Sequence, residues 1–430
     1  GMVGAGAGST AGTITERPSR VRYGVIVFAI TLAVLSYVDR VCISQAAPDI
    51  ARDLHFSDVD MGKIFGAFGL AYALFEIPTG WLGDWMGPRK VLMRIVLWWS
   101  AFTALTGAMR SFTTMWITRF LFGVGEAGCF PNLTKAFTTW LPPVEHAKAQ
   151  GIMWTFARWG GAFTPVLVVM VLRYVSWRYA FAMFAGLGVV WAFFFYAWYR
   201  DDPREHKGVN AAELALLAGS EQLASGHGNV PWAKLLRSRS LWLLWLQYFC
   251  LCFPWYFYVT WLPTYLQQHW KLSAGEAARL AIFPLFFGGV GSLLCGSIST
   301  RLGRRFGLTH TRRWLASSGF LGAGLFLVLA VQLHNPNWVM LAMGMAGFCN
   351  DVVMPPSWAA CMDIGGKYAG TVSGSMNMMG NLAAYVSPVA GGYILAATGR
   401  NWDVFLYLMA AVYLLGSVIW PFIDPETPIE

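Results

Sequence analysis

Apolar stretches alternate with short polar segments along almost the whole chain. A helix rises about 1.5 Å per residue, so about 20 apolar residues cross the hydrocarbon layer of a membrane, which is roughly 30 Å thick. We predict an all-α membrane protein with twelve transmembrane helices. They lie at residues 22–48, 60–83, 89–109, 112–138, 147–172, 177–199, 240–266, 276–300, 314–333, 338–362, 367–396 and 402–422.

One long polar interval, residues 200–239, divides the predicted helices into two groups of six. Residues 210–224 within it can form an amphipathic helix on the protein surface. The predicted domains are a flexible cytoplasmic N-terminus at 1–21, a six-helix bundle at 22–200, a cytoplasmic linker at 201–239, a second six-helix bundle at 240–422 and a cytoplasmic tail at 423–430.

The loops on the two sides of the predicted bundle differ in basic residues. Cytoplasmic loops of membrane proteins are enriched in Lys and Arg. If both termini are cytoplasmic, about 19 of the 31 Lys and Arg residues fall on that side and about 8 on the other. We therefore predict that both termini are cytoplasmic. The net charge of +9 is spread over these loops rather than gathered in one block, so no nucleic-acid partner is expected.

The composition agrees with this class of protein. Hydrophobic residues make up 56% of the chain and charged residues only 12%, which excludes a water-soluble enzyme core and a disordered chain. The sequence has no HExxH, GxSxG or nucleotide-binding loop, and its seven histidines lie in or near predicted loops, so no enzyme is expected. The seven cysteines have no CxxC spacing, and we interpret them as free thiols rather than metal ligands or disulfides.

The two halves share a local pattern. The segment after the second predicted helix, Gly80–Lys90, reads GWLGDWMGPRK, and the segment after the eighth, Gly296–Arg305, reads GSISTRLGRR. Both place a glycine, a turn and a basic pair at the same relative positions. Parallel repeats of this kind are typical of transporters that rock two halves about a site at the midplane.

The first of these segments, in a chain of six plus six helices, resembles the signature of the major facilitator superfamily. Four further motifs are similar to those of the anion:cation symporter family, which includes bacterial D-galactonate, glucarate and hexuronate transporters. These motifs are Ser36–Arg40 (SYVDR), Arg119–Ala127 (RFLFGVGEA), Trp261–Tyr265 (WLPTY) and Gly374–Asn381. The resemblance implies two rocking halves, a small organic anion as substrate and protons as the coupling ion, with no other cofactor and no metal.

The resemblance also implies roles for particular positions. It assigns proton binding to Asp39 and Glu126. The positions matched to substrate contacts are Tyr37, Tyr72, Trp358 and Asn377. The positions matched to a gating latch on the cytoplasmic side are Gly80, Asp84, Gly87 and Arg89; the alternative is a plain tight turn between two helices.

Charged residues inside the predicted spans require a reason, because each costs at least about 2.5–3.5 kcal/mol at the membrane centre. Arg119 and Glu126 are seven residues apart, so they share one helix face. Asp39 and Arg40 are neighbours that diverge by about 100° around their helix, so only one of them can face a central site squarely. The alternative role is a set of ion pairs that join helices.

Three arginines are candidates for binding an anion: Arg40, Arg119 and Arg158, with gating as the alternative role of the first two. The guanidinium group binds a carboxylate through two parallel hydrogen bonds. Arg158 would favour a second carboxylate on the substrate, or it links helices. Asn377 and Asn381 share a helix face, and their amides suit a polyhydroxylated substrate, with hydrogen bonding between helices as the alternative.

Two further acidic residues lie in predicted spans. Glu76 follows Tyr72 by one turn, and we interpret it as a packing or gating partner. Asp351 stands beside Asn350 in a helix that the pair Pro355 and Pro356 is expected to break, and it is a second candidate for proton binding.

We expect a monomeric proton symporter in a bacterial inner membrane that imports a sugar acid or a hydroxy-dicarboxylate. A drug or cation exporter of the same fold is one alternative, although it would need a cavity dominated by acidic and aromatic residues. A sodium-coupled anion symporter is another.

Overall fold

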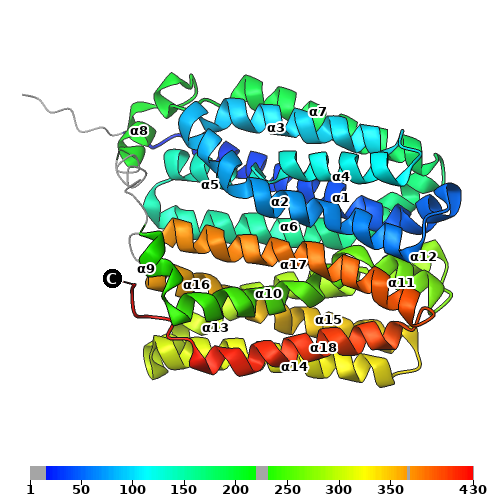
Figure 1. The fold of residues 1–430 in the computed structure, drawn as a ribbon. Coiled ribbons are helices and arrows are strands. Elements are labelled where there is room, and N and C mark those ends of the chain that lie inside the picture. Colours follow the sequence, from blue (N-terminus) through cyan, green and yellow to red (C-terminus); the bar gives the residue numbers. More distant parts are fainter. Residues whose placement is uncertain (1–15, 219–230, 366–368, 430) are drawn as a thin grey trace, which may run out of the picture.

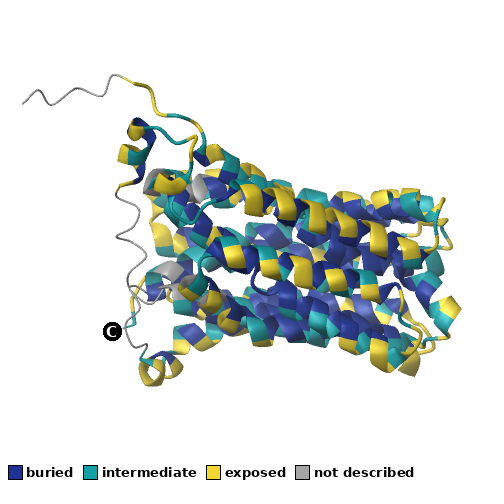
Figure 2. Cartoon of the chain, turned by 90° about the horizontal axis from the view of Figure 1, so that it is seen from above, coloured by how far each residue is buried: buried dark blue, intermediate teal, exposed yellow. Residues whose placement is uncertain are grey.

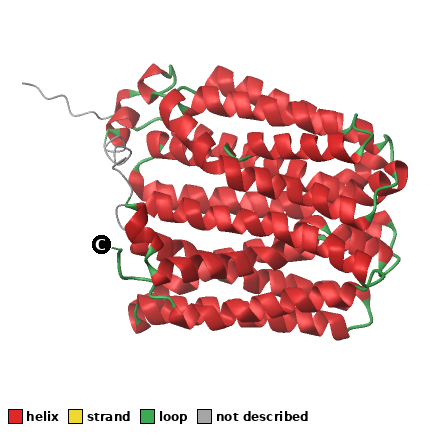
Figure 3. Ribbon diagram, in the orientation of Figure 1, coloured by secondary structure: helices red, strands yellow, loops and turns green. Residues whose placement is uncertain are grey.

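The computed structural model describes residues 16–218, 231–365 and 369–429, except for the side chains at positions 80, 81, 84, 143, 144, 146–148, 300, 362, 369 and 370. These residues form helices joined by short turns, with no strand among them (Figure 3). The long helices run along one common axis, and the polar linker and the end of the chain lie at one end of the bundle (Figure 1).

The first half of the chain forms the upper layer of Figure 1. Its helices are α1 (Arg22–Leu54), α2 (Asp58–Met86), α3 (Pro88–Thr106), α4 (Phe112–Glu126), α5 (Cys129–Trp140), α6 (Pro143–Leu172) and α7 (Trp177–Trp198).

The second half forms the lower layer. Its helices are α10 (Arg239–Thr260), α11 (Leu262–Gln268), α12 (Ala274–Leu280), α13 (Ile282–Phe306), α14 (Leu308–Gln332), α15 (Pro336–Val352), α16 (Met354–Gly365), α17 (Ala369–Ala397) and α18 (Trp402–Ile419), followed by the short η4 (Trp420–Phe422).

Each apolar segment predicted from the sequence is largely helical where it is described. Within the described ranges, seven helices are long and apolar enough to cross a membrane. They cover Arg22–Leu54, Ala149–Leu172, Trp177–Trp198, Ala274–Phe306, Leu308–Gln332, Pro336–Gly365 and Trp402–Phe422.

Four of the predicted segments are interrupted. The breaks lie between α4 and α5, α10 and α11, α12 and α13, and α15 and α16. Each break comes two to four residues before a proline, because proline lacks the N–H that would bond back one turn and its ring clashes with the carbonyl there. The prolines are Pro131, Pro263, Pro284 and Pro355. Only the last break was predicted.

The two predicted loops of the internal repeat are largely helical, which corrects the sequence prediction. Helix α2 continues to Met86 and turns at Gly87, where φ is 85°. Helix α13 continues to Phe306 and turns at Gly307, where φ is 87°. The turns are therefore equivalent, but the second lies four residues further on than the sequence pattern indicated. A drop in hydropathy does not end a helix, because its backbone bonds are satisfied in water as well as in lipid.

The two turn glycines give a matched test of this geometry. A side chain strains the backbone at either position, at a cost of about 1–3 kcal/mol. At Gly307 no atom lies within 4 Å of an added Cβ, whereas at Gly87 the Cβ would lie 2.5 Å from a carboxylate oxygen of Asp201. We expect Gly87→Ala to lower the unfolding temperature of the purified protein more than Gly307→Ala. An equal decrease of the unfolding temperature in both variants would contradict the packing of Asp201 on the turn at Gly87.

Apolar side chains cover the outside of the bundle. Phe193, Trp338 and Val418 are 70%, 60% and 62% exposed. Figure 2 shows the buried positions on the inward faces of the helices and the exposed positions on the outer faces. A surface of large hydrophobic residues around a core that contains charged residues suits a lipid environment.

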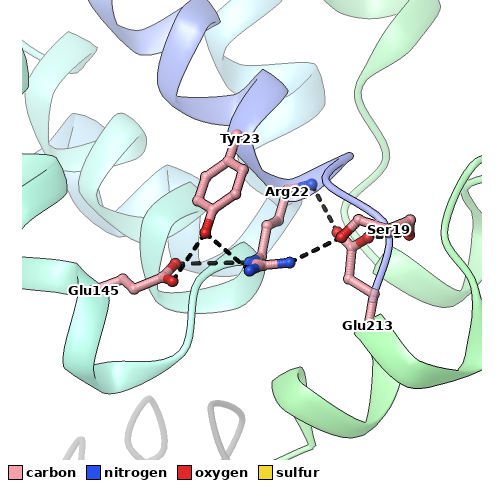
Figure 4. Close-up of polar contacts among 5 residues, drawn as sticks. All are labelled: Ser19, Arg22, Tyr23, Glu145 and Glu213. Atoms are coloured by element: carbon pink, nitrogen blue, oxygen red, sulfur yellow. Dashed lines mark hydrogen bonds and ion pairs between the residues drawn. The ribbon is translucent and has the colours of Figure 1, made fainter. Parts of the chain in front are cut away.

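The linker is bound to the end of the bundle where α1 begins. It contains η1 (Pro203–Glu205), α8 (Ala211–Leu217) and α9 (Trp232–Leu236). Glu213 on α8 accepts the backbone N–H of Arg22 at 2.7 Å and the hydroxyl of Ser19. Glu145 on α6 accepts from the hydroxyl of Tyr23 at 3.2 Å and lies 3.7 Å from Arg22 (Figure 4). Helix α8 confirms part of the helix predicted at 210–224; residues 219–224 lie outside the described ranges.

The two halves meet most closely at the opposite end. Helix α2 packs along α17, α6 packs against α12 and α13, and α1 packs against α11. A Cβ on Gly69 of α2 would lie 2.6 Å from the backbone of Ala384 on α17, so only glycine allows this approach. At the same end Asp58 pairs with Arg400 at 2.7 Å. Toward the linker, Gly374 has no neighbour within 4 Å of an added Cβ. The halves are therefore closed at the end away from the linker.

Candidate substrate and proton site

A buried ion pair joins α1 to α4 in the middle of the first half. The guanidinium of Arg40 donates to one carboxylate oxygen of Glu126 through Nε at 2.8 Å and through Nη2 at 2.6 Å. The hydroxyl of Ser36 donates to the same oxygen at 2.6 Å. The other oxygen of Glu126 is buried and has no hydrogen-bond partner among the described residues. These short contacts identify Arg40 as the cation that neutralises Glu126.

Aromatic rings surround the same guanidinium. The Cζ atom of Arg40 lies 4.6 Å from the ring centre of Tyr37, 4.7 Å from that of Phe68 and 5.4 Å from that of Tyr72. Faces of aromatic rings attract cations, so these contacts stabilise the charge of Arg40 away from water. Two of the positions predicted to contact substrate, Tyr37 and Tyr72, therefore lie directly against it.

Asp39 faces away from this pair. It is fully buried, and neither carboxylate oxygen has a hydrogen-bond partner among the described residues. Trp99 on α3 is beside it, with its indole N–H short of a hydrogen bond, and Arg119 and Glu126 are close enough to act on its charge. The expected divergence of two neighbouring residues is thus observed: Arg40 faces the second half of the chain, and Asp39 faces α3 and α4.

Arg40 and Arg119 lie on the wall of one pocket between the two halves. The second half contributes Tyr256 and Thr260 from α10, and α2 contributes Phe68. The pocket has a volume of about 10 Å³, which is the space of about one water molecule, so a larger solute enters only when the halves move. Arg119 is buried, and within the described residues it has no carboxylate within 4.0 Å.

A second ion pair crosses from one half to the other. Arg158 on α6 lies 3.3 Å from Asp351 on α15, measured from Nε to Oδ2. Its Nη1 approaches the hydroxyl of Tyr37 at 3.5 Å, and its Cζ lies 4.2 Å from the ring centre of Trp255. The sequence presented Arg158 and Asp351 as separate candidates, and the structure brings them together.

A third buried carboxylate also joins the halves. Glu76 on α2 accepts hydrogen bonds from the side-chain amides of Asn377 and, at 3.4 Å, of Asn381, both on α17. Glu76 is buried, and no cation lies within 4.0 Å of it among the described residues. Glu76 was predicted to be a packing or gating partner, and the structure places it in contact with the other half of the chain. That it binds the two predicted substrate contacts was not predicted, because nothing in the sequence sets α2 beside α17.

The remaining predicted positions are more scattered. Trp358 is half-buried on α16, with its ring 5.9 Å from that of Tyr248. Arg89 donates to the backbone carbonyl of Tyr196 at 2.7 Å, so it is bound within its own half. Its backbone N–H donates to Asp201 at 3.0 Å. Of the other predicted latch residues, Gly87 forms the turn, and the surroundings of Gly80 and the side chain of Asp84 lie outside the described part.

Apart from Arg119, the buried groups that are candidates for binding an anion are in contact with carboxylates of the protein. These contacts are Arg40 with Glu126, Arg158 with Asp351, and Asn377 and Asn381 with Glu76. In the described ranges, no three His, Cys, Asp or Glu residues are close enough together to hold a metal ion. The arrangement suits reversible exchange between an internal carboxylate and an external anion.

Two halves of long apolar helices, with charged groups buried where the halves meet, define a multi-span membrane transporter. The chain belongs to the Major Facilitator Superfamily, whose family profile matches residues 29–388. The members of this superfamily are transporters, not enzymes.

Relatives and solved structures agree with this family. The chain is 33% identical to the probable sulfoacetate transporter SauU of Cupriavidus necator, over 92% of each protein. It is 29% identical to the probable galactarate/D-glucarate transporter GudP of Escherichia coli, over 93% of each. A bacterial homologue of the human lysosomal transporter Spinster, in an inward-facing and unoccupied conformation, has the same fold with a TM-score of 0.74. That alignment covers 94% of this chain and 99% of that one at 19% identity.

Proposed function

We propose that this protein is a proton-coupled symporter that carries a small organic anion into the cell. The observation that carries the proposal is the buried ion pair of Arg40 and Glu126, with a second buried carboxylate, Asp39, that has no hydrogen-bond partner among the described residues. The names of the similar proteins, which are given as transporters of sulfoacetate and of galactarate or D-glucarate, support an acidic substrate.

In the proposed topology the chain crosses the inner membrane of a bacterium twelve times as a monomer, with both termini in the cytoplasm. The spans are α1, α2, α3, α4 with α5, α6, α7, α10 with α11, α12 with α13, α14, α15 with α16, α17 and α18. The excess of Lys and Arg near the linker supports this orientation. The contact of Asp58 with Arg400 then lies on the outer side, so the conformation described here is closed to the outside.

The coupling follows from competition for Arg40. An arriving anion binds this guanidinium in place of Glu126. Glu126 then remains buried without its cation, and burial disfavours its charged form, so it takes up a proton. Each ligand thereby favours binding of the other, which is the thermodynamic condition for coupling. Asp39, which has no hydrogen-bond partner in the described chain, is the second proton-binding group.

The same groups argue against the exporter of drugs or cations. A cationic substrate would meet Arg40 and Arg119 in the pocket between the halves. An acid with hydroxyl groups would instead find guanidinium groups at one end, and the amides of Asn377 and Asn381 once Glu76 has moved. The proposed substrate is therefore a sugar acid or another small acid with hydroxyl groups.

Thermal stabilisation of the purified protein tests the substrate class. A ligand that binds only the folded state stabilises it by about 2.7 kcal/mol at a hundredfold excess over its dissociation constant. We expect stabilisation by sulfoacetate, D-glucarate or D-galactonate and none by neutral sugars or lipophilic cations. Stabilisation by the cations alone would replace the symporter with the exporter.

A further inference from the structure

The contact between Arg158 and Asp351 differs in quality from the other buried ion pair. The three approaches of the Arg158 guanidinium to Asp351 and Tyr37 measure 3.3, 3.5 and 3.5 Å. The bonds from Arg40 to Glu126 measure 2.6 and 2.8 Å. Ordinary N–H···O hydrogen bonds are about 2.9–3.0 Å long, so Arg158 is loosely held although it is buried. The N–H groups of Arg158 can therefore form shorter hydrogen bonds with another acceptor, such as an acidic group of a substrate.

Arg158 and Arg40 are separated by one side chain. The hydroxyl of Tyr37 is within 3.5 Å of Arg158, and the ring of the same tyrosine lies 4.6 Å from the Cζ of Arg40. The two guanidinium groups therefore stand at two sides of one tyrosine, on α1 and α6 of the first half. Because both guanidinium groups contact this side chain, they are candidates for binding the two ends of one small acid.

We propose that Arg158 is a second anion-binding group of the same substrate site, that Asp351 occupies it when no substrate is bound, and that the transporter therefore selects small acids with two negative groups. This inference rests on the proposed function, because it assumes that an organic anion binds between the halves. The inference adds two points to that function: the substrate carries two negative groups, and Arg158 is the residue that distinguishes such an acid from one with a single negative group.

The surroundings of Asp351 suit a carboxylate that is released and recaptured. Asn350 donates to Asp351 at 3.1 Å, and the hydroxyl of Tyr413 in turn donates to Asn350 at 2.8 Å. When Arg158 turns to a substrate, Asp351 therefore keeps a hydrogen-bond donor within its own half. The ring of Trp255 packs on the face of the Arg158 guanidinium, with its centre 4.2 Å from Cζ, and this contact stabilises the cation.

The exchange also bears on the movement of the halves. Arg158 belongs to the first half, and Asp351, Asn350 and Trp255 belong to the second. Without substrate, the ion pair holds the two halves together near the middle of the bundle. A substrate with two acidic groups removes this tie, whereas a substrate with one acidic group leaves it in place. We therefore expect acids with two negative groups to be preferred over acids with one in transport as well as in binding.

Two matched pairs of acids test the proposal. D-Glucarate and D-gluconate differ only in that a hydroxymethyl group replaces one carboxylate, and the same holds for sulfoacetate and isethionate. Dissociation constants are measured by calorimetry with the full-length protein in detergent. In at least one pair, we expect the wild type to bind the diacid more tightly by about 30-fold, the size of effect seen when one partner of a buried charge pair is lost.

Three variants test whether Arg158 and Asp351 cause the preference for the diacid. Arg158→Gln should abolish the advantage of the diacid while the affinity for the monoacid stays within about threefold. Arg158→Lys should keep part of the advantage, because a point charge remains without the planar fork. Asp351→Asn should bind the diacid more tightly than the wild type, because no internal carboxylate competes, with little change for the monoacid. The last two variants carry the test if Arg158→Gln does not fold.

Several results would overturn the inference. If the wild type binds both members of each pair equally, the second anion site does not exist, although the proposed function stands. If Arg158→Gln loses equal affinity for both acids, or if Asp351→Asn binds the diacid more weakly, the ion pair only joins α6 to α15. If no member of either pair binds, the proposed function fails together with the inference.

Discussion

Accumulation of substrate against its gradient should disappear when Glu126 is replaced by Gln or Asp39 by Asn, while exchange of substrate across the membrane continues. The amides keep the size of the side chains but cannot bind or release a proton. Glu126 accepts hydrogen bonds from Arg40 and Ser36, and Asp39 is buried without a hydrogen-bond partner in the described residues. These are the two carboxylates to which the proposed coupling assigns the proton. Accumulation and counterflow are both measured with labelled acid in proteoliposomes.

The matched control for these two variants is Glu276→Gln. Glu276 is exposed on α12, away from the buried pairs, and its replacement should leave accumulation unchanged. If both Asp39→Asn and Glu126→Gln still accumulate substrate under a pH gradient, the proton is carried elsewhere. Loss of exchange together with accumulation would instead place Glu126 in substrate binding alone.

Replacing Arg119 by Gln should separate binding from stability. Arg119 is a buried cation with no carboxylate within 4.0 Å among the described residues, and an unpaired buried charge costs several kcal/mol. The variant without substrate should therefore be at least as stable as the wild type. Because Arg119 lines the pocket with Arg40, the variant should lose the thermal stabilisation by the acidic ligand.

The contrast with Arg40 makes this prediction specific. Arg40→Gln removes the only cation that contacts Glu126 in the described structure, so it should lower the stability of the empty protein. Breaking such a buried pair costs about 3–5 kcal/mol. If Arg119→Gln is destabilised as much as Arg40→Gln, Arg119 has a structural partner, and its assignment to anion binding is wrong.

Competition between internal carboxylates and substrate gives a common explanation for the two buried ion pairs, Arg40 with Glu126 and Arg158 with Asp351. Without substrate, an isolated arginine in a dry site would be costly, and Glu126 and Asp351 offset this cost. The same carboxylates must leave when an anion binds. One of them, Glu126, is proposed to take up the coupling proton. The other, Asp351, is proposed to set the charge of the substrate.

The sequence alone predicted most of the fold, because an apolar helix in lipid leaves a long and periodic signal. The ends of the helices were predicted to within six residues. The family was identified from motifs in the first, fourth, seventh and eleventh predicted spans. The helix breaks were less predictable. Pro131 and Pro284 follow breaks, whereas Pro48 and Pro165 lie inside continuous helices. Whether proline breaks a helix depends on the neighbouring helices that can satisfy the freed backbone.

The partners of the buried charges could not be predicted. Arg119 and Glu126 share a helix face, which suggested that they act together, yet Glu126 binds Arg40 from another helix. Residues one or two turns apart are visible in a sequence, but contacts between helices depend on packing. The pairs that join the two halves, Glu76 with Asn377 and Arg158 with Asp351, are separated by more than 190 positions.

The central claim is that protons enter with the acid. The most direct measurement uses proteoliposomes that contain a trapped pH indicator, with no initial pH gradient and no sodium. Addition of D-glucarate or sulfoacetate outside should acidify the interior, and Glu126→Gln liposomes should show no change. Uptake of labelled acid without acidification would contradict the proposed coupling. Uptake that appears only when a sodium gradient is then imposed would identify a sodium-dependent anion transporter.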